Sequence, residues 1–171
     1  PALSQWVMRS VVSLLVQTQA RNFSVSMNVT ARDLESPLFM DSLLMQLQRF
    51  AIEPSRLQLE FTESVLIEQL EVVQQQLLRA REVGIDIAID DFGTGYSNWS
   101  YRTRIPASVV KLDRSLIHKS ALDNREAMLV QALVTLASEL GYRVTAEGIE
   151  TAELLEQARA WGCTEAQGFH L

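Results

Sequence analysis

Six short segments with alternating apolar and polar residues recur along this 171-residue chain, and helical segments separate most of them. Successive side chains of a strand point to opposite faces, so each segment predicts a strand with one apolar and one polar face. Helices between successive strands are typical of parallel βα units. The expected strands are residues 23–29, 57–61, 85–90, 109–113, 142–148 and 164–169.

Apolar residues repeat with the helical period in the intervening segments, which predicts helices that each cover one face of a sheet. Glycines at 84, 141 and 162 follow three of these segments, where helices commonly end. The expected apolar stripes are Leu3, Val7, Val11 and Leu14; Phe39, Leu43, Leu47 and Phe50; Leu66, Leu70, Val73, Leu77 and Ala80; Leu129, Leu133, Leu136 and Leu140; and Leu154, Ala158 and Trp161.

Two-faced strands and intervening helices are compatible in one architecture, the (β/α)₈ barrel. There, one face of each strand packs on helices and the other points into the barrel. Such a barrel needs eight strands and about 250 residues, whereas this chain supplies six strands. We therefore expect an α/β fold, a modified (β/α)₈ TIM-type barrel, whose N-terminal strands are absent from this chain. The length fits a single domain over residues 1–171.

Polar side chains stand on the inward face near the C-terminal end of every expected strand. Barrels of this type carry their active sites at that end, and their interiors are normally filled with bulky apolar residues. One such residue alone would usually be a surface charge, a turn or a helix cap. Their coincidence on six strands favours a functional site. The residues are Asn28, Glu60, Asp90, Lys111, Glu147 and Gln167, with Asp91 directly after Asp90.

Oxygen donors dominate this set, and clustered carboxylates repel one another unless protons or cations compensate them. One lysine does not suffice, and an all-oxygen set suits Mg²⁺ or Mn²⁺. The histidines, His118 and His170, lie away from the strand ends in sequence, which weakens a zinc interpretation. Adjacent carboxylates can serve two ions that activate water and stabilise a phosphoryl transition state. Lys111 would then face the phosphate or the attacking hydroxide.

Charge and composition narrow the possible partners and location. A net charge of −6 argues against binding of DNA or RNA duplexes through bulk charge, although a small phosphate ligand remains possible. Cys163 is the one cysteine, so no internal disulfide can form, and a cytoplasmic location is expected. The longest apolar runs are too short to span a bilayer. Membrane tethering of a longer parent protein stays open.

Several motifs together resemble the EAL-domain family of cyclic di-GMP phosphodiesterases. DDFGTGYS at 90–97 is followed by KLD at 111–113, AEGIET at 146–151 and QGF at 167–169. SMNVT at 26–30 is similar to the family's S-V-N-L-S segment, and EFTES at 60–64 to its E-I-T-E-S segment. The resemblance runs from about Trp6 to the last residue, in the same order.

The resemblance implies hydrolysis of cyclic di-GMP to pGpG with two Mg²⁺ or Mn²⁺ ions. The implied metal ligands are Asn28, Glu60, Asp90, Asp91 and Glu147. Lys111 would hold the nucleophilic water and the phosphate, and Glu147 would orient the second metal and its water. Glu63 would anchor the loop 91–97, which couples the metal site to dimerisation in the family. The residues expected to line or support the site are Gln167, Asp113, Gly93 and Thr94.

The chain departs from the family pattern mainly at its ends. The Glu-Ala-Leu signature is absent and is expected upstream of Pro1, where its glutamate would be a further metal ligand. The C-terminus stops shortly before the family's S-R-P segment. We therefore expect a domain that is incomplete at the N-terminus and slightly truncated at the C-terminus, with little hydrolysis by the isolated chain. Trp99, Arg102 and Ser108 also differ from the usual residues, but none occupies a metal position.

The resemblance further implies a homodimer formed through the barrel and upstream sensory or GGDEF domains in the parent protein. Two alternatives to the hydrolase remain. A catalytically degenerate member would bind cyclic di-GMP without cutting it, particularly if the upstream glutamate is lost. An unrelated barrel enzyme could use Lys111 as a Schiff-base nucleophile, but nearby carboxylates such as Asp113 would favour the unreactive protonated amine.

Overall fold

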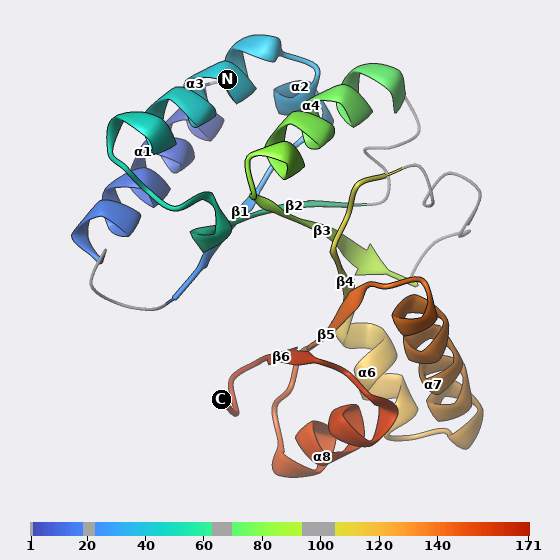
Figure 1. Ribbon diagram of the computed structural model, residues 1–171. Helices are drawn as coiled ribbons and strands as arrows, with labels where there is room; N and C mark the ends of the chain where they lie inside the picture. Colours follow the sequence, from blue (N-terminus) through green and yellow to red (C-terminus); the bar gives the residue numbers. More distant parts are fainter. Residues whose placement is uncertain (1, 19–22, 63–69, 94–104) are drawn as a thin grey trace. The chain divides into compact units, whose positions relative to one another are not determined.

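The computed structural model describes residues 2–18, 23–62, 70–93 and 105–171, which form two compact units (Figure 1). The first unit contains the described residues up to Ala88, together with Ile105 and Pro106. The second contains Ile89–Gly93 and Ala107–Leu171. Strand β3, Asp86–Phe92, therefore contributes to both units. We describe each unit by itself.

The first unit contains two parallel strands, the start of β3, and helices packed on one another. Strand β1 pairs with β2 from Val25↔Leu57 to Asn28↔Glu60. Helix α3 contacts both α1 and α4. The elements are α1 (Ala2–Gln17), β1 (Val25–Asn28), α2 (Ala31–Leu34), α3 (Pro37–Arg49), a 3₁₀ turn (Pro54–Arg56), β2 (Leu57–Thr62) and α4 (Leu70–Glu82).

The second unit contains the end of β3 and three further strands. Strand β4 pairs in parallel with β5, and β5 pairs in parallel with β6, up to Glu147↔Gln167. The strand order follows the chain, β1-β2-β3 in the first unit and β3-β4-β5-β6 in the second. The elements are β4 (Val109–Leu112), α6 (Arg114–Ser120), α7 (Asn124–Glu139), β5 (Arg143–Glu147), α8 (Ala152–Trp161) and β6 (Glu165–Gln167). The prediction of six strands, parallel in these pairs, is confirmed.

Three of the expected apolar stripes are buried as predicted, apart from Phe50 at the end of one. The buried residues are Phe39, Leu43 and Leu47 of α3, Val73, Leu77 and Ala80 of α4, and Leu154, Ala158 and Trp161 of α8. They join the apolar strand residues in the core, since Leu57, Leu59 and Phe61 of β2 are almost fully buried. Leu66 and the side chain of Leu70 fall outside the described part.

The predicted stripes of α1 and α7 are wrong by about one position. Helix α1 buries Met8, Val12 and Leu15, while Leu3 is 72% exposed. Helix α7 buries Val130, Val134 and Ala137, while Leu129 is 48% and Leu136 42% exposed. Both segments hold apolar residues at more positions than one face can accommodate, so the helical period fits two neighbouring stripes equally well.

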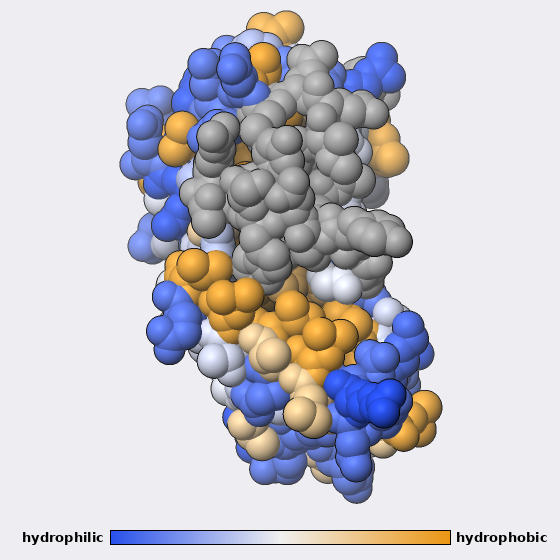
Figure 2. Space-filling model, turned by 90° about the vertical axis from the view of Figure 1, so that its right-hand side faces the viewer, coloured by the Kyte–Doolittle hydropathy of each residue, from blue (hydrophilic) through white to orange (hydrophobic). Residues whose placement is uncertain are grey.

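One consequence is an apolar surface on α7. The side of the molecule that Figure 2 displays carries a patch of apolar side chains, and α7 exposes Met128, Leu129 and Leu136. Leu140, which directly follows the helix, is exposed as well. None of the helices within the described ranges has the length and apolar character that crossing a bilayer requires.

Candidate functional site

Two predicted oxygen donors stand side by side in the first unit. Asn28 ends β1, and its Cα partner in the parallel pairing is Glu60 of β2. Two residues earlier, the Ser26 hydroxyl donates a hydrogen bond to Gln58 Oε1 over 3.0 Å, so these positions share one face of the pair. Glu60 is buried, and its carbonyl accepts a 2.8 Å hydrogen bond from the Val29 N–H. The strand pairing thus places an amide and a carboxylate next to each other.

The second unit brings together three other predicted residues. Lys111 of β4 is 4% exposed, and its Nζ lies 2.6 Å from Glu147 Oε1 and 3.8 Å from Asp90 Oδ1. Asp90 belongs to β3, and Glu147 is the last residue of β5. Because a buried ammonium group is costly without partners, the two carboxylates fix the direction of the lysine side chain. An ammonium group held in this way can donate hydrogen bonds to a phosphate oxygen or a water.

Asp91 adds further negative charge beside Asp90. Its backbone has a φ of 55°, in the left-handed region, and its N–H donates a 3.0 Å hydrogen bond to Asp90 Oδ1. Although the residue is exposed, partial loss of hydration, followed by the charges of Asp90 and Asp113, raises the pKa of the Asp91 carboxyl, while Lys111 opposes this effect. The sequence predicted that the strand ends at Asp90, before Asp91. Strand β3 instead extends to Phe92, so Asp91 lies within it. The crowding of carboxylates favours an additional cation.

The remaining predicted residues occupy supporting positions or lie outside the described part. Gln167 of β6 is the Cα partner of Glu147. Asp113 caps α6 by accepting a 2.9 Å hydrogen bond from the Ser115 N–H, which is a structural role beside the site. Gly93 follows β3 with a φ of 94°. Glu63 and Thr94 lie outside the described residues.

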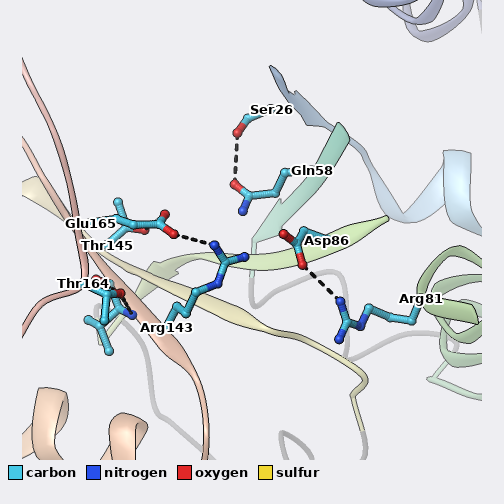
Figure 3. A network of polar contacts seen from close by, with 9 residues as sticks. Ser26, Gln58, Arg81, Asp86, Arg143, Thr145, Thr164 and Glu165 are labelled. Atoms are coloured by element: carbon cyan, nitrogen blue, oxygen red, sulfur yellow. Dashed lines mark hydrogen bonds and ion pairs between the residues drawn. The ribbon is translucent and has the colours of Figure 1, made fainter. Parts of the chain in front are cut away.

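In each unit, polar side chains also precede these residues along the strands, and sequence reasoning did not identify the contacts that they make (Figure 3). In the first unit, Arg81 of α4 lies 3.1 Å from Asp86 of β3. In the second unit, Arg143 lies 2.6 Å from Glu165, which also accepts a 3.0 Å hydrogen bond from the Thr145 hydroxyl. Arg143 and Thr145 precede Glu147 on the same face of β5. Ion pairs and hydrogen bonds therefore orient the strand that carries Glu147.

The structure also brings an unpredicted histidine to the site. His118 lies away from the strand ends in sequence, but its Nε2 is 2.9 Å from the carbonyl oxygen of Gly148, the residue directly after Glu147. Arg114 lies one helical turn before His118 and pairs with Glu150 over 2.9 Å. The sequence does show that Arg114 and His118 are four residues apart, directly after the KLD motif. This spacing predicts that both lie on the same side of a helix. It could not reveal their partners, which are distant in sequence.

A hollow of about 320 Å³ adjoins this part of the second unit. Its lining combines cationic, anionic, amide and aromatic side chains, which suits a ligand with both phosphates and bases. The lining residues are Arg114, Glu147, Gly148, Glu150, Gln167, Gly168 and Phe169. A larger hollow, of about 450 Å³, lies between α1, α2 and α3 in the first unit. Its lining includes none of the predicted site residues, so we do not assign the chemistry there.

The donor chemistry within each unit fits a hard divalent cation. The first unit supplies an amide and a carboxylate oxygen in register. The second supplies neighbouring carboxylates, and partial loss of hydration, followed by the charges of Asp90 and Asp113, raises the pKa of Asp91. Within the described ranges, His, Cys, Asp and Glu side chains do not form a group of three that could hold a metal ion. The predicted ligands are divided between the two units.

Comparison with known proteins identifies the family. The family model described as EAL domain matches residues 1–171. "Cyclic di-GMP phosphodiesterase PA2567" of Pseudomonas aeruginosa is 46% identical over 169 residues, which are 98% of this chain and 29% of that protein. The chain thus spans less than a third of the length of this curated relative.

Solved structures support the same assignment. The structure titled "PaMucR Phosphodiesterase, c-di-GMP complex" is 33% identical with a TM-score of 0.86, over 97% of this chain and 68% of that one. The EAL domain of Mycobacterium smegmatis DcpA is 32% identical with a TM-score of 0.90, over 98% of this chain and 77% of that one. The parallel α/β fold predicted from the sequence agrees with these structures, which have a TIM-like barrel. This chain belongs to the EAL-domain family.

Proposed function

We propose that this chain carries the catalytic residues of a cyclic di-GMP phosphodiesterase, which hydrolyses one phosphodiester bond of the cyclic dinucleotide to give linear pGpG. The observation that carries the proposal is the buried Lys111, held between the carboxylates of Glu147 and Asp90. It places one cation and two acids at adjacent strands of a domain whose relative is named a cyclic di-GMP phosphodiesterase.

EAL phosphodiesterases are in general metal-dependent, and we propose two Mg²⁺ or Mn²⁺ ions here. The proposed ligands are Asn28, Glu60, Asp90, Asp91 and Glu147, which supply the oxygen donors that these ions prefer. When bound, such a pair of ions supplies an activated water at neutral pH and neutralises charge on the phosphate. The raised pKa of Asp91, caused first by partial loss of hydration and then by the charges of Asp90 and Asp113, supports the proposal, because a bound cation would stabilise the ionised carboxylates.

The protein's own groups would then hold the substrate and the attacking water. The Lys111 ammonium group donates hydrogen bonds to the water or to a non-bridging phosphate oxygen, and Glu147 keeps the ammonium in place. Gln167 borders the hollow beside Glu147, where part of the dinucleotide would lie. Gly93 and Thr94 belong to the loop 91–97, and we propose that Glu63 anchors this loop next to Asp91.

The decisive experiment replaces Asp90 with Asn in the full-length parent protein. Asp90→Asn should lower the hydrolysis of cyclic di-GMP by about 100-fold or more, the scale of losing one group that acts on the transition state. Asp86→Asn is the matched control, because Asp86 lies on the same strand and pairs with Arg81. Product is measured as pGpG with Mg²⁺ or Mn²⁺, and EDTA should abolish it in the unchanged protein. Full turnover by Asp90→Asn would refute the assignment.

A second candidate function is a receptor that binds cyclic di-GMP without cutting it. The observation in its favour is the hollow beside Glu147, whose charged, amide and aromatic lining suits binding whether or not the ligand is cut. The two functions separate in one assay of the full-length protein. A receptor would bind cyclic di-GMP in the presence of Mn²⁺ and release no pGpG during prolonged incubation.

We further infer that the parent protein forms a homodimer. The support is the apolar surface of α7, with Met128, Leu129 and Leu136 exposed in the second unit. Large apolar side chains exposed together on one helix are a common feature of interaction sites. The partner would be a second copy of the chain.

A further inference from the structure

The loop that follows β5 carries the most informative contacts outside the predicted set. It consists of Gly148, Ile149 and Glu150, directly after Glu147 and before the N-cap residue Thr151 of α8. The loop backbone is hydrogen-bonded on two sides. Any displacement of this backbone would move the carboxylate of Glu147, because the two are consecutive in the chain.

Helix α6 holds the loop from one side. The Gly148 carbonyl oxygen can only accept a hydrogen bond, so the Nε2 of His118 that lies 2.9 Å away carries the proton. Gly148 has a φ of 71°, and a Cβ atom there would collide with the Arg114 side chain. The backbone at this point therefore fits against α6 only as glycine.

The last residue of β6 and the segment after it hold the loop from the other side. The Ile149 N–H donates a 3.0 Å hydrogen bond to the Gln167 carbonyl, and the Ile149 carbonyl accepts a 3.1 Å hydrogen bond from the His170 N–H. A Cβ atom on Gly168 would overlap the Ile149 backbone. The loop backbone is thus held between α6 on one side and the residues from Gln167 to His170 on the other, and Glu147 directly precedes it.

The contacts of α6 with the loop differ in strength. Arg114 and Glu150 form a pair whose side chains are 57% and 34% exposed, and exposed ion pairs contribute little to stability. His118 Nε2 also lies 3.9 Å from Glu150 Oε2, which is too long for a hydrogen bond. The hydrogen bond from His118 to Gly148 is part-buried and acts directly on the backbone beside Glu147. It is the contact best placed to fix that carboxylate.

We propose that His118 is a positioning residue, which acts on the reaction by holding the Gly148 carbonyl and thereby the Glu147 carboxylate against Lys111. The inference rests on the proposed function, since it concerns the position of a residue of that site. His118 does not touch the substrate in this assignment. Its contribution passes through the backbone of the loop, in the way that groups behind a metal ligand orient it.

The test compares two side chains of similar length at position 118 in the full-length protein. His118→Gln keeps an N–H donor near the original Nε2, whereas His118→Met has none. Lys119→Met is the control, because Lys119 is an exposed neighbour on the same helix. We expect His118→Met to lower kcat by about 10–100-fold, with KM changed by less than about 3-fold. His118→Gln should recover most of kcat, and Lys119→Met should match the unchanged protein.

A second readout does not need activity. In the metal-free protein, NMR of the Lys111 ammonium group and hydrogen exchange of the Ile149 amide report the ion pair with Glu147 and the loop hydrogen bond. His118→Met should shift the Lys111 signal and accelerate Ile149 exchange, and His118→Gln should do neither. If His118→Met does not fold, the unchanged protein provides the test. A slowly exchanging proton on His118 Nε2, with a nuclear Overhauser contact to residue 148, would support the proposal. The absence of this signal would overturn it.

The outcomes separate this inference from the proposed function. If the unchanged protein yields no pGpG, the proposed function fails, while the NMR comparison still decides whether His118 positions Glu147. If His118→Met lowers only the melting temperature, and kcat and the Lys111 signal stay unchanged well below it, His118 is merely structural and the inference fails. Equal kcat losses in His118→Gln and His118→Met would also overturn it.

Discussion

At the scale of single residues, the position of Lys111 determines the electrostatics of the site. Its ammonium group is almost fully buried, whereas its partners Asp90 and Glu147 retain 19% and 18% of their side-chain exposure. The three groups therefore form a partly desolvated set in which one cation faces two anions. Removing the ammonium group of Lys111 would take away its ion pairs with both carboxylates.

Lys111→Met tests this directly, because methionine matches the length of the apolar part of lysine. We expect a loss of unfolding free energy of about 1–3 kcal/mol, below the 3–5 kcal/mol typical of a fully buried broken pair because the carboxylates keep some hydration. Turnover should fall by about 100-fold or more. Urea denaturation and pGpG release measure the two effects. Lys119→Met is the exposed control, and equal behaviour of the two variants would contradict the role given to Lys111.

Cys163 gives a residue-scale prediction away from the site. Burial raises the pKa of its thiol to about 11. Because only the thiolate is nucleophilic, alkylation by iodoacetamide near pH 8 should be about 100-fold slower than that of an unperturbed thiol. The rate should rise about tenfold per pH unit towards pH 11. Labelling followed by mass spectrometry checks this, with the same protein in denaturant as the fast reference. Rapid labelling of the folded protein would contradict the prediction.

At the scale of elements, period-two alternation identified all six strands and the polar residue near the end of each. Alternation is a local property, and parallel pairing then places equivalent ends together, as in Asn28↔Glu60 and Glu147↔Gln167. The buried faces of α1 and α7 could not be predicted, because several apolar stripes compete on each helix. The contact between His118 and Gly148 could not be predicted either, since it joins residues 30 apart through tertiary packing.

Arg56 joins three elements of the first unit, and it offers a stability prediction. Its guanidinium group donates hydrogen bonds to the carbonyls of Leu15 and Thr18 at the end of α1 and of Phe23 before β1, over 3.0–3.2 Å. Lysine cannot reproduce this planar fork of donors. Arg56→Lys should cost about 1–3 kcal/mol of unfolding free energy, the scale of hydrogen bonds that involve a charged group.

Urea denaturation of the purified protein measures the effect of Arg56→Lys. Arg49→Lys is the control, because Arg49 lies at the end of α3 and its described contact is with the neighbouring Phe50 ring, 5.5 Å away. It should change stability by less than about 0.5 kcal/mol, as exposed substitutions usually do. Equal losses for the two variants would show that Arg56 does not connect these elements as described.

At the scale of the whole molecule, the apolar surface of α7 has to be reconciled with an acidic protein. A net charge of −6 opposes self-association through long-range repulsion, but this repulsion is screened beyond about 8 Å at physiological salt. Apolar contact acts at short range and contributes roughly 25 cal/mol per Å² removed from water. Burial of the α7 surface between two copies can therefore exceed the repulsion, most readily at moderate ionic strength.

The dimer proposal predicts that charge introduced into this surface prevents association. Leu136→Glu should raise the dimer dissociation constant by at least about tenfold, because it replaces apolar contact with a carboxylate facing its symmetry-related copy. Leu122→Glu is the matched control, since Leu122 is even more exposed but lies before α7. Light scattering of the full-length protein over a concentration series measures the constant. Dissociation by both substitutions would indicate a general effect of added charge, and dissociation by neither would place the dimer contact elsewhere. Loss of the dimer in Leu136→Glu alone would assign the contact to α7.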